Sequence, residues 1–129
     1  MIAVDTNIIV RLLTQDDEPQ YRASIDLFQT SEIFIPDPVI LETEWVLRFA
    51  YGFKAHEICT AFRKIFGLPN VYLANENLTA QVLQWYESGM DFTDALHLAT
   101  SPHCSALYTF DNALIKGAKT LADQRVKKP

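Results

Sequence analysis

The chain has 129 residues, of which 49% are hydrophobic and 21% charged, with four glycines and six prolines. A chain of this length can bury its own core, and this composition is that of a globular fold with little room for disorder or a long linker. The formal net charge of −5 is unfavourable for a nucleic-acid enzyme, because phosphate binding normally uses Lys and Arg. We predict a single domain over residues 1–129.

The amino terminus and the cysteines favour a cytoplasmic protein. The first residues lack the basic stretch and apolar segment of a secretory signal, and no apolar run is long enough to span a membrane. Cys59 and Cys104 are isolated from each other, which fits reduced thiols better than a disulfide framework or a zinc site. We therefore expect a cytoplasmic location and no membrane partner.

Short apolar strands alternate with amphipathic helices along the chain. The predicted elements, in chain order, are a strand at 2–4, a helix including Ile8 to Leu13, a helix starting at Asp17 to Pro19, a strand at 33–35, a helix from Asp37 to about Ala50, a helix from Ala55 stopped by Gly67, a strand at 71–73, a helix after Asn75, a helix from Phe92 to about Thr100 and a strand at 107–110. Residues 121–129 show no clear fifth strand. The alternation predicts an α/β fold with three layers, α/β/α, around a central and mostly parallel sheet.

Two acidic residues directly follow predicted strands. Asp5 comes after the first strand, and Asp111 ends the last one. Both are therefore expected at the carboxyl edge of the sheet, where the active crevice of such folds lies. The alternative is that Asp5 only caps the following helix and Asp111 only belongs to a turn.

Glu42 is predicted to lie on a buried helix face. At about 100° per residue, that face consists of Val39, Glu42, Val46 and Phe49. Glu44 points the other way and is predicted to be solvated. An ionised carboxylate among apolar side chains must be paired, protonated or bound to metal, since desolvating it alone is costly. A salt bridge from Glu42 to Arg11 or Arg48 is the alternative to a metal.

Asp91 and Asp94 begin one helix together. They are three residues apart and therefore share a helix face. The alternative to a metal role is that both acids only stabilise the helix start, with Asp91 as its cap and Asp94 in a favourable position in the helix dipole. This alternative accounts well for the presence of one acid and less well for the presence of both.

The coincidence of these acids favours a metal site. Strand-end acids, an acid in an apolar stripe and a helix-start pair can all converge on one edge of the sheet. Oxygen-only clusters suit Mg²⁺ or Mn²⁺, which can activate water and offset charge on the leaving oxygen of a phosphodiester. Bound cations would also offset the negative net charge. The tail is basic and either assists phosphate binding or is simply solvated; its basic residues are Lys116, Lys119, Arg125, Lys127 and Lys128.

These segments resemble the PIN domain family, and in particular the VapC-type toxins of toxin–antitoxin pairs. The resemblance spans nearly the whole chain and is carried by residues 4–9, 41–47, 91–96 and 108–111. It implies a Rossmann-like sheet and an Mg²⁺- or Mn²⁺-dependent endoribonuclease. The positions that match the family's metal-binding and catalytic acids are Asp5, Glu42, Asp94 and Asp111. The positions that match its supporting residues are Asp91, Thr6, Asn7 and Thr109.

The resemblance also implies an RNA substrate, a small VapB-like antitoxin and a homodimer. Two interpretations keep the fold but change the role: a catalytically silent PIN module that binds RNA or a protein, and a PIN nuclease of RNA processing that is not a toxin. A phosphotransferase of the haloacid-dehalogenase type fits less well, because it needs a second Asp where this chain has Asn7. A phosphoacceptor signalling domain needs an acidic pair after the first strand, which is not evident here.

Overall fold

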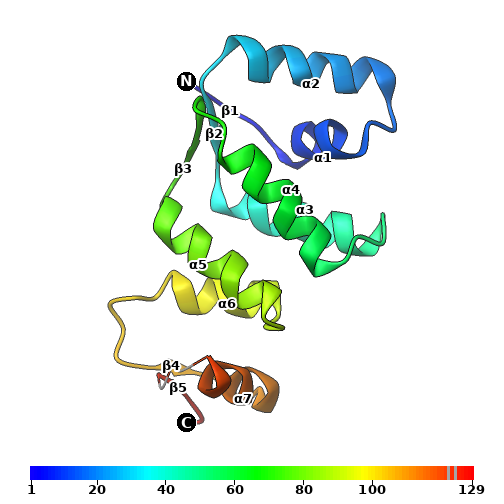
Figure 1. Ribbon diagram of the computed structural model, residues 1–129. Coiled ribbons are helices and arrows are strands. Elements are labelled where there is room, and N and C mark those ends of the chain that lie inside the picture. Colours follow the sequence, from blue (N-terminus) through cyan, green and yellow to red (C-terminus); the bar gives the residue numbers. More distant parts are fainter. Residues whose placement is uncertain (122, 124) are drawn as a thin grey trace. The chain divides into compact units, whose positions relative to one another are not determined.

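The computed structural model describes residues 1–121, 123 and 125–129 as two compact units, Met1–Glu76 and Asn77–Pro129 (Figure 1). Both units combine helices with short strands that pair in parallel. The predicted α/β class with parallel strands is therefore confirmed. In the part of the chain that is described, no helix has the length and apolar character that crossing a membrane requires.

The first unit follows the predicted order of elements closely. Its elements are β1 (Ile2–Ala3), α1 (Thr6–Thr14), α2 (Glu18–Thr30), β2 (Ile33–Ile35), α3 (Asp37–Phe49), α4 (Ala55–Phe66) and β3 (Val71–Leu73). The start of α2 is set by Asp17, whose side chain accepts a hydrogen bond from the backbone N–H of Gln20, with Pro19 in the first turn. These are the ordinary signals that begin a helix.

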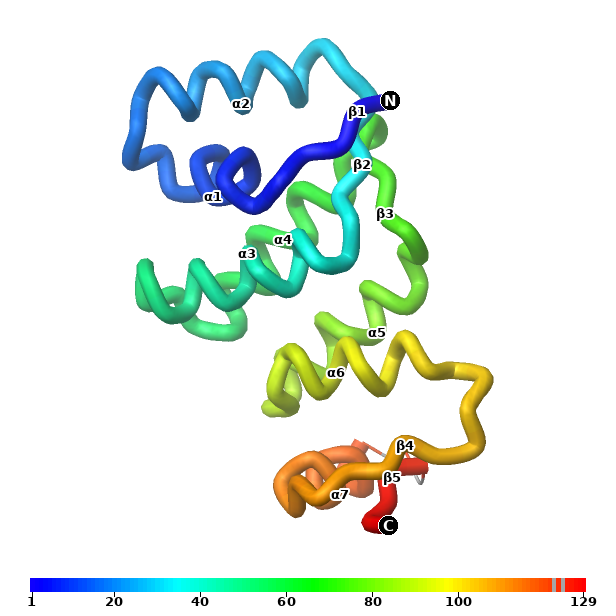
Figure 2. The backbone as a smooth tube through the Cα atoms, turned by 180° about the vertical axis from the view of Figure 1, so that it is seen from behind, coloured from blue at the N-terminus to red at the C-terminus, as the bar shows by residue number. Residues whose placement is uncertain are grey.

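The three strands of the first unit form a parallel sheet in the order β1-β2-β3. Ile33 at its centre pairs with Ile2 on one side and Val71 on the other, and it is fully buried. Figure 2 shows β1 running directly into α1 and β2 running directly into α3. Because parallel strands end at the same edge, the beginnings of α1 and α3 lie at one edge of this sheet.

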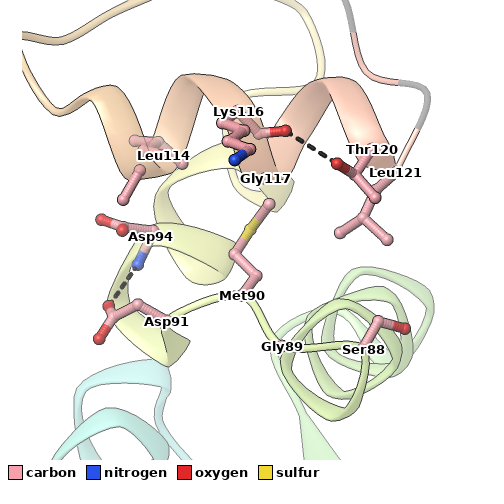
Figure 3. Close-up of a pocket in the computed structure, with 11 residues that line it drawn as sticks. Ser88, Gly89, Met90, Asp91, Asp94, Leu114, Lys116, Gly117, Thr120 and Leu121 are labelled. Atoms are coloured by element: carbon pink, nitrogen blue, oxygen red, sulfur yellow. Dashed lines mark hydrogen bonds between the residues drawn. The ribbon is translucent and has the colours of Figure 1, made fainter.

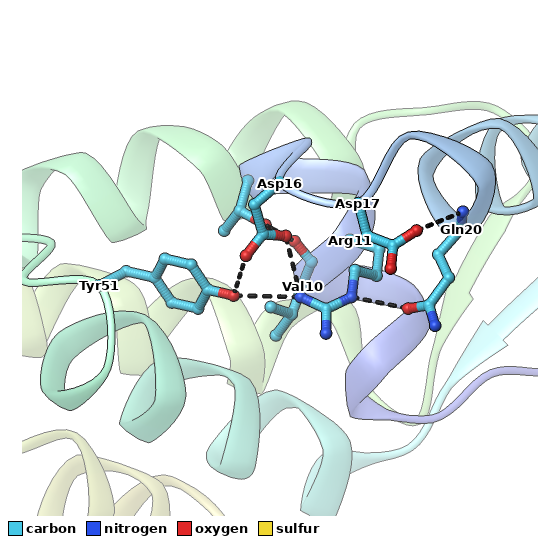
Figure 4. A network of polar contacts seen from close by, with 7 residues as sticks. Val10, Arg11, Asp16, Asp17, Gln20 and Tyr51 are labelled. Carbon is cyan, nitrogen blue, oxygen red and sulfur yellow. Dashed lines mark hydrogen bonds and ion pairs between the residues drawn. The ribbon is translucent and has the colours of Figure 1, made fainter.

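A polar network fixes the far end of α1 (Figure 4). Arg11 donates to Asp16, to the Tyr51 hydroxyl and to Gln20 of α2, and the Tyr51 hydroxyl donates to Asp16 at 2.6 Å. The hydrogen bond from Tyr51, together with those from Thr14 and Arg11, lowers the pKa of Asp16. The network therefore ties α1 to α2 and to the turn after α3.

The second unit contains two elements that the sequence analysis did not predict. Its elements are α5 (Glu76–Glu87), α6 (Phe92–Ala99), β4 (Leu107–Tyr108), α7 (Asn112–Thr120) and β5 (Val126–Lys127). The expectation that residues 121–129 hold no strand is wrong, because β5 pairs in parallel with β4. Val126 is buried, and Leu107 and Thr109 donate backbone hydrogen bonds to residues of the tail.

The basic tail is partly structural. The guanidinium of Arg125 donates to the carbonyl oxygens of Ser101 at 2.6 Å and Leu98 at 3.4 Å, at the carboxyl end of α6. It also forms an ion pair with Asp123 at 3.0 Å. Arg125 thereby adds charge-assisted hydrogen bonds at the carboxyl end of α6, to carbonyl groups that also accept backbone hydrogen bonds from Ser101 and Cys104. The interpretation of the tail as simply solvated is wrong for this residue.

Candidate functional site

Asp5 lies between β1 and α1 and caps the helix. Its Oδ1 accepts a hydrogen bond from the backbone N–H of Ile8 at 3.4 Å, and the side chain is otherwise exposed. Thr6 is buried as the first residue of α1, and Asn7 beside it is exposed. The predicted place of Asp5 at the edge of the sheet is confirmed for the sheet of the first unit, and its capping role coexists with that place.

Glu42 is exposed, which contradicts the predicted burial of its helix face. The buried residues of α3 are Ile40, Thr43, Glu44 and Leu47. Their spacing of three and four residues defines a helix face that does not include Glu42. Phe49, expected on the buried face, is also exposed. Burial therefore does not force Glu42 to bind a metal, although its exposed carboxylate is accessible to a ligand.

Glu44 is the buried glutamate of α3, where solvation was predicted. Only 1% of it is exposed, and Arg48 donates to its two oxygens at 2.7 and 3.3 Å. The pairing one turn apart on the same helix allows a carboxylate to be buried without a metal. Arg11 likewise pairs with Asp16. The two arginines considered as partners of Glu42 are thus each paired with another acid.

Asp91 and Asp94 lie together at the start of α6 (Figure 3). Asp91 is the N-cap, and its Oδ1 accepts a hydrogen bond from the backbone N–H of Asp94 at 3.1 Å. Asp94 is half-buried, and Figure 3 shows its carboxylate directed toward Leu114 of α7. The two acids therefore begin the helix as predicted, with Asp91 capping and Asp94 facing α7.

The surroundings of Asp94 in the second unit disfavour the ionised form of its carboxyl group. Burial and the negative charges of Asp91 and Asp111 raise the pKa of Asp94, and His97 acts in the opposite direction. Like charges gathered around a half-buried carboxyl group disfavour its ionised form. The structure therefore brings two other candidate acids, Asp91 and Asp111, within electrostatic reach of Asp94.

Asp111 caps α7. Its Oδ1 accepts hydrogen bonds from the backbone N–H groups of Ala113 at 2.8 Å and Leu114 at 3.3 Å. The backbone N–H of Asp111 donates in turn to the Thr109 hydroxyl at 3.0 Å. Thr109 thus fixes the backbone from which Asp111 extends, and its supporting role at the site stays a prediction.

The donor set of the second unit fits a divalent cation. Its three acids offer carboxylate oxygens, the ligands that Mg²⁺ and Mn²⁺ prefer. Asp91 and Asp111 cap helices through Oδ1, which leaves their second oxygens without a hydrogen bond from the described residues of this unit. No Arg or Lys of the same described residues forms an ion pair with any of the three.

The second unit does not complete a metal site by itself. Over residues 1–121, 123 and 125–129, no three His, Cys, Asp or Glu side chains lie close enough together to hold a metal ion. Asp5 and Glu42 belong to the first unit, whereas Asp94 and Asp111 belong to the second. The convergence of all four acids on one cation stays a prediction.

A cavity of about 460 Å³ lies beside Asp91 and Asp94 in the second unit (Figure 3). One wall is formed by α7 and the other by the turn between α5 and α6. This cavity was not predictable without α7, a helix that was not expected from the sequence. The capping residue Asp111 followed by apolar side chains four residues apart, Leu114 and Ala118, is the signal that could have revealed the helix.

The comparison with protein-family models matches the PIN domain over residues 2–119. The chain therefore belongs to the PIN domain family, and its helices and parallel strands are consistent with the α/β/α fold of that family. PIN domains are generally nucleases and typically use divalent metals. The searches of curated proteins and of solved structures gave no significant match.

Proposed function

We propose that this protein is an Mg²⁺- or Mn²⁺-dependent endoribonuclease. The observation that carries the proposal is the placing of Asp91, Asp94 and Asp111 at the starts of α6 and α7, where burial and the charges of Asp91 and Asp111 raise the pKa of Asp94 against the opposing effect of His97. Because the chain belongs to a family of nucleases, we place the centre of the active site at these acids.

The proposed metal ligands and catalytic residues are Asp5, Glu42, Asp94 and Asp111. The bound cation would activate water and offset charge on the leaving oxygen of the phosphodiester. Asp91 holds the first turn of α6 and keeps Asp94 directed toward α7. Thr109 fixes the backbone of Asp111, and Thr6 and Asn7 flank Asp5 in the first turn of α1. The proposal treats residues 1–129 as a single PIN-like domain, because its ligands come from both units.

The proposed enzyme is the toxin of a VapC-type pair, acting on RNA in the cytoplasm as a homodimer until a VapB-like antitoxin inhibits it. The resemblance of residues 4–9, 41–47, 91–96 and 108–111 to that group supports this role. The competing role is a catalytically silent PIN module, and RNA cleavage distinguishes the two.

The test of the enzymatic role is cleavage of a structured RNA by the purified chain. We expect cleavage with Mg²⁺ or Mn²⁺, no cleavage with EDTA, and loss of cleavage in Asp5→Asn. The matched control is Asp26→Asn, which makes the same change at an exposed position in α2. Equal cleavage by wild type and Asp5→Asn would show that the assigned site is wrong.

The toxin role needs a separate experiment in cells. Induced expression of the wild-type chain should arrest growth, and expression of Asp5→Asn should not. Co-expression of the small protein encoded by the neighbouring gene, the proposed antitoxin, should restore growth. Normal growth of a host whose RNA is being cleaved would identify a nuclease of RNA processing instead.

A further inference from the structure

The cavity beside Asp91 and Asp94 has the size and lining of a ligand-binding site. Its volume of about 460 Å³ lies in the range of small-molecule and cofactor pockets. Met90 and Leu114 contribute buried apolar side chains to its walls. Such walls suit the flat face of an aromatic ring system, which is the part of a nucleotide that least needs water.

The polar groups of the cavity are distributed in a way that fits a nucleotide. Asp91 and Asp94 lie at the end where the metal site is proposed, and Lys116 lies on the α7 wall (Figure 3). Lys116 shares the cavity with two carboxylates, yet its ammonium group forms no ion pair within the described residues of the second unit. A cation held near an acidic centre is suited to bind an anionic group of the substrate.

We propose that this cavity binds one nucleotide of the RNA substrate adjacent to the cleaved bond, and that Lys116 binds the phosphate of that nucleotide. The inference rests on the proposed function, because the acids that line the cavity are assigned there to RNA cleavage. It adds a subsite for recognition of the substrate. The apolar walls hold the base, and the shape of the cavity selects which bases fit.

The first test compares two lysines of α7. Lys116 lines the cavity, whereas Lys119 does not, and both are exposed. Loss of a charge-assisted contact with phosphate corresponds to roughly a tenfold change in binding. We therefore expect Lys116→Ala to raise the KM for RNA roughly tenfold, and we expect Lys119→Ala, with the same loss of charge, to leave it near the wild-type value.

The second test fills the cavity from Gly117. This residue lines the cavity, and a Cβ atom added to it would meet no atom within 4 Å beyond its chain neighbours and the backbone of its own helix. Gly117→Phe is therefore expected to place its ring in the open space without displacing the backbone. Lys119→Phe is the matched control, since it adds the same ring to α7 at an exposed position that does not line the cavity. Gly117→Phe should lose affinity for RNA or change its preferred cleavage site, and Lys119→Phe should do neither.

A binding measurement answers the same question without cleavage. The full chain is titrated with AMP, CMP, GMP and UMP in metal-free buffer, and the backbone amide shifts are followed by NMR. We expect at least one nucleotide to shift the amides around Met90 and from Leu114 to Leu121. Lys116→Ala should weaken that binding roughly tenfold, and Gly117→Phe should abolish it.

The possible outcomes separate this inference from the proposed function. If no nucleotide perturbs the cavity, or if the lysine and glycine variants behave like their controls, the subsite is refuted, and a protein segment becomes the alternative occupant. If wild type cleaves RNA, Asp5→Asn does not, and the subsite tests fail, only the subsite is wrong. If nucleotides bind in the cavity but Asp5→Asn cleaves normally, the assigned metal site is wrong and the subsite stands.

Discussion

At the scale of single residues, the carboxyl group of Asp94 combines partial burial with two acidic neighbours. Burial, Asp91 and Asp111 all raise its pKa, and the charge of His97 opposes them. A group with these surroundings is destabilising when ionised and is stabilised by a cation. Asp94 therefore links proton binding to stability in one side chain, and under the proposed function it links both to metal binding.

Stability in metal-free buffer should depend on pH through Asp94. A carboxyl group whose pKa is higher in the folded protein than in the unfolded chain binds more protons when folded. Its contribution to stability is therefore lost as the pH rises from the ordinary value of 3.8 through the raised pKa. Chemical unfolding at several pH values should show this loss in wild type. Asp94→Asn should remove it, and an unchanged pH dependence in that variant would contradict the assignment.

The two glutamates of α3 should have opposite phenotypes. Glu42 is exposed, so Glu42→Gln should change the free energy of unfolding by less than about 0.5 kcal/mol and abolish RNA cleavage. Glu44 is buried against Arg48, so Glu44→Ala should lower stability by about 1–3 kcal/mol, with the partial exposure of Arg48 keeping the effect below that of a fully buried pair. Denaturant unfolding measures the stability of each variant, and an RNA cleavage assay measures its activity. Loss of stability in the first variant and not in the second would overturn the burial seen in α3.

At the scale of elements, the helix starts hold the candidate acids. Asp5, Asp91 and Asp111 all cap helices as well as standing at the candidate site. Capping is therefore compatible with the metal role, because one carboxylate oxygen accepts the backbone hydrogen bond and the second is available. The two roles can be separated chemically, since Asn caps helices about as well as Asp but lacks the charge.

Substitutions of Asp111 should separate capping from metal binding. Asp111→Asn should keep the stability of α7 and abolish metal-dependent cleavage. Asp111→Ala should abolish cleavage and also lower the free energy of unfolding by about 1 kcal/mol, the usual cost of losing an N-cap. Thermal or denaturant unfolding in EDTA provides the measurement. Equal stability of the two variants would show that the cap contributes nothing to α7.

Arg125 should stabilise the carboxyl end of α6. It donates to the carbonyl groups of Leu98 and Ser101 and pairs with Asp123. Because Arg125 is partly exposed, Arg125→Ala should lower the free energy of unfolding by about 1–2 kcal/mol. Lys128→Ala removes an exposed positive charge from the same tail and is the control. A similar, small effect of both changes would favour a solvated tail.

At the scale of the whole molecule, elements set by local chemistry were predictable from the sequence. Asp17 with Pro19 and Asp91 with the apolar residues after it carry their own start signals, and both helices begin where predicted. The buried face of α3 was not predictable in the same way. Val39, Ile40, Val46 and Leu47 offer two apolar faces. The structure buries the face with Ile40 and Leu47, which also carries Glu44 in its ion pair with Arg48.

The missed elements have weak local signals. In α7, Lys116, Gly117 and Lys119 interrupt the apolar spacing, so the helix depends on its Asp111 cap and its packing. In β5, only Val126 is buried, and the strand is defined by its pairing with β4. Of the candidate site, the helix starts and their acids were predicted, whereas the exposure of Glu42 and the cavity beside Asp94 depend on tertiary packing.

The central claim is that acids from both units bind one cation. The measurement that tests it most directly is a calorimetric titration of the full chain with Mn²⁺. Wild type and the control Asp26→Asn should bind Mn²⁺ alike. Losing even a supporting group of a metal site commonly weakens binding roughly 10–100-fold, so a change to any true ligand should have at least that effect. The variants expected to show it are Asp5→Asn, Glu42→Gln, Asp94→Asn and Asp111→Asn. If the two variants of the first unit bind Mn²⁺ as wild type does, acids from both units do not share one cation, and the account is contradicted.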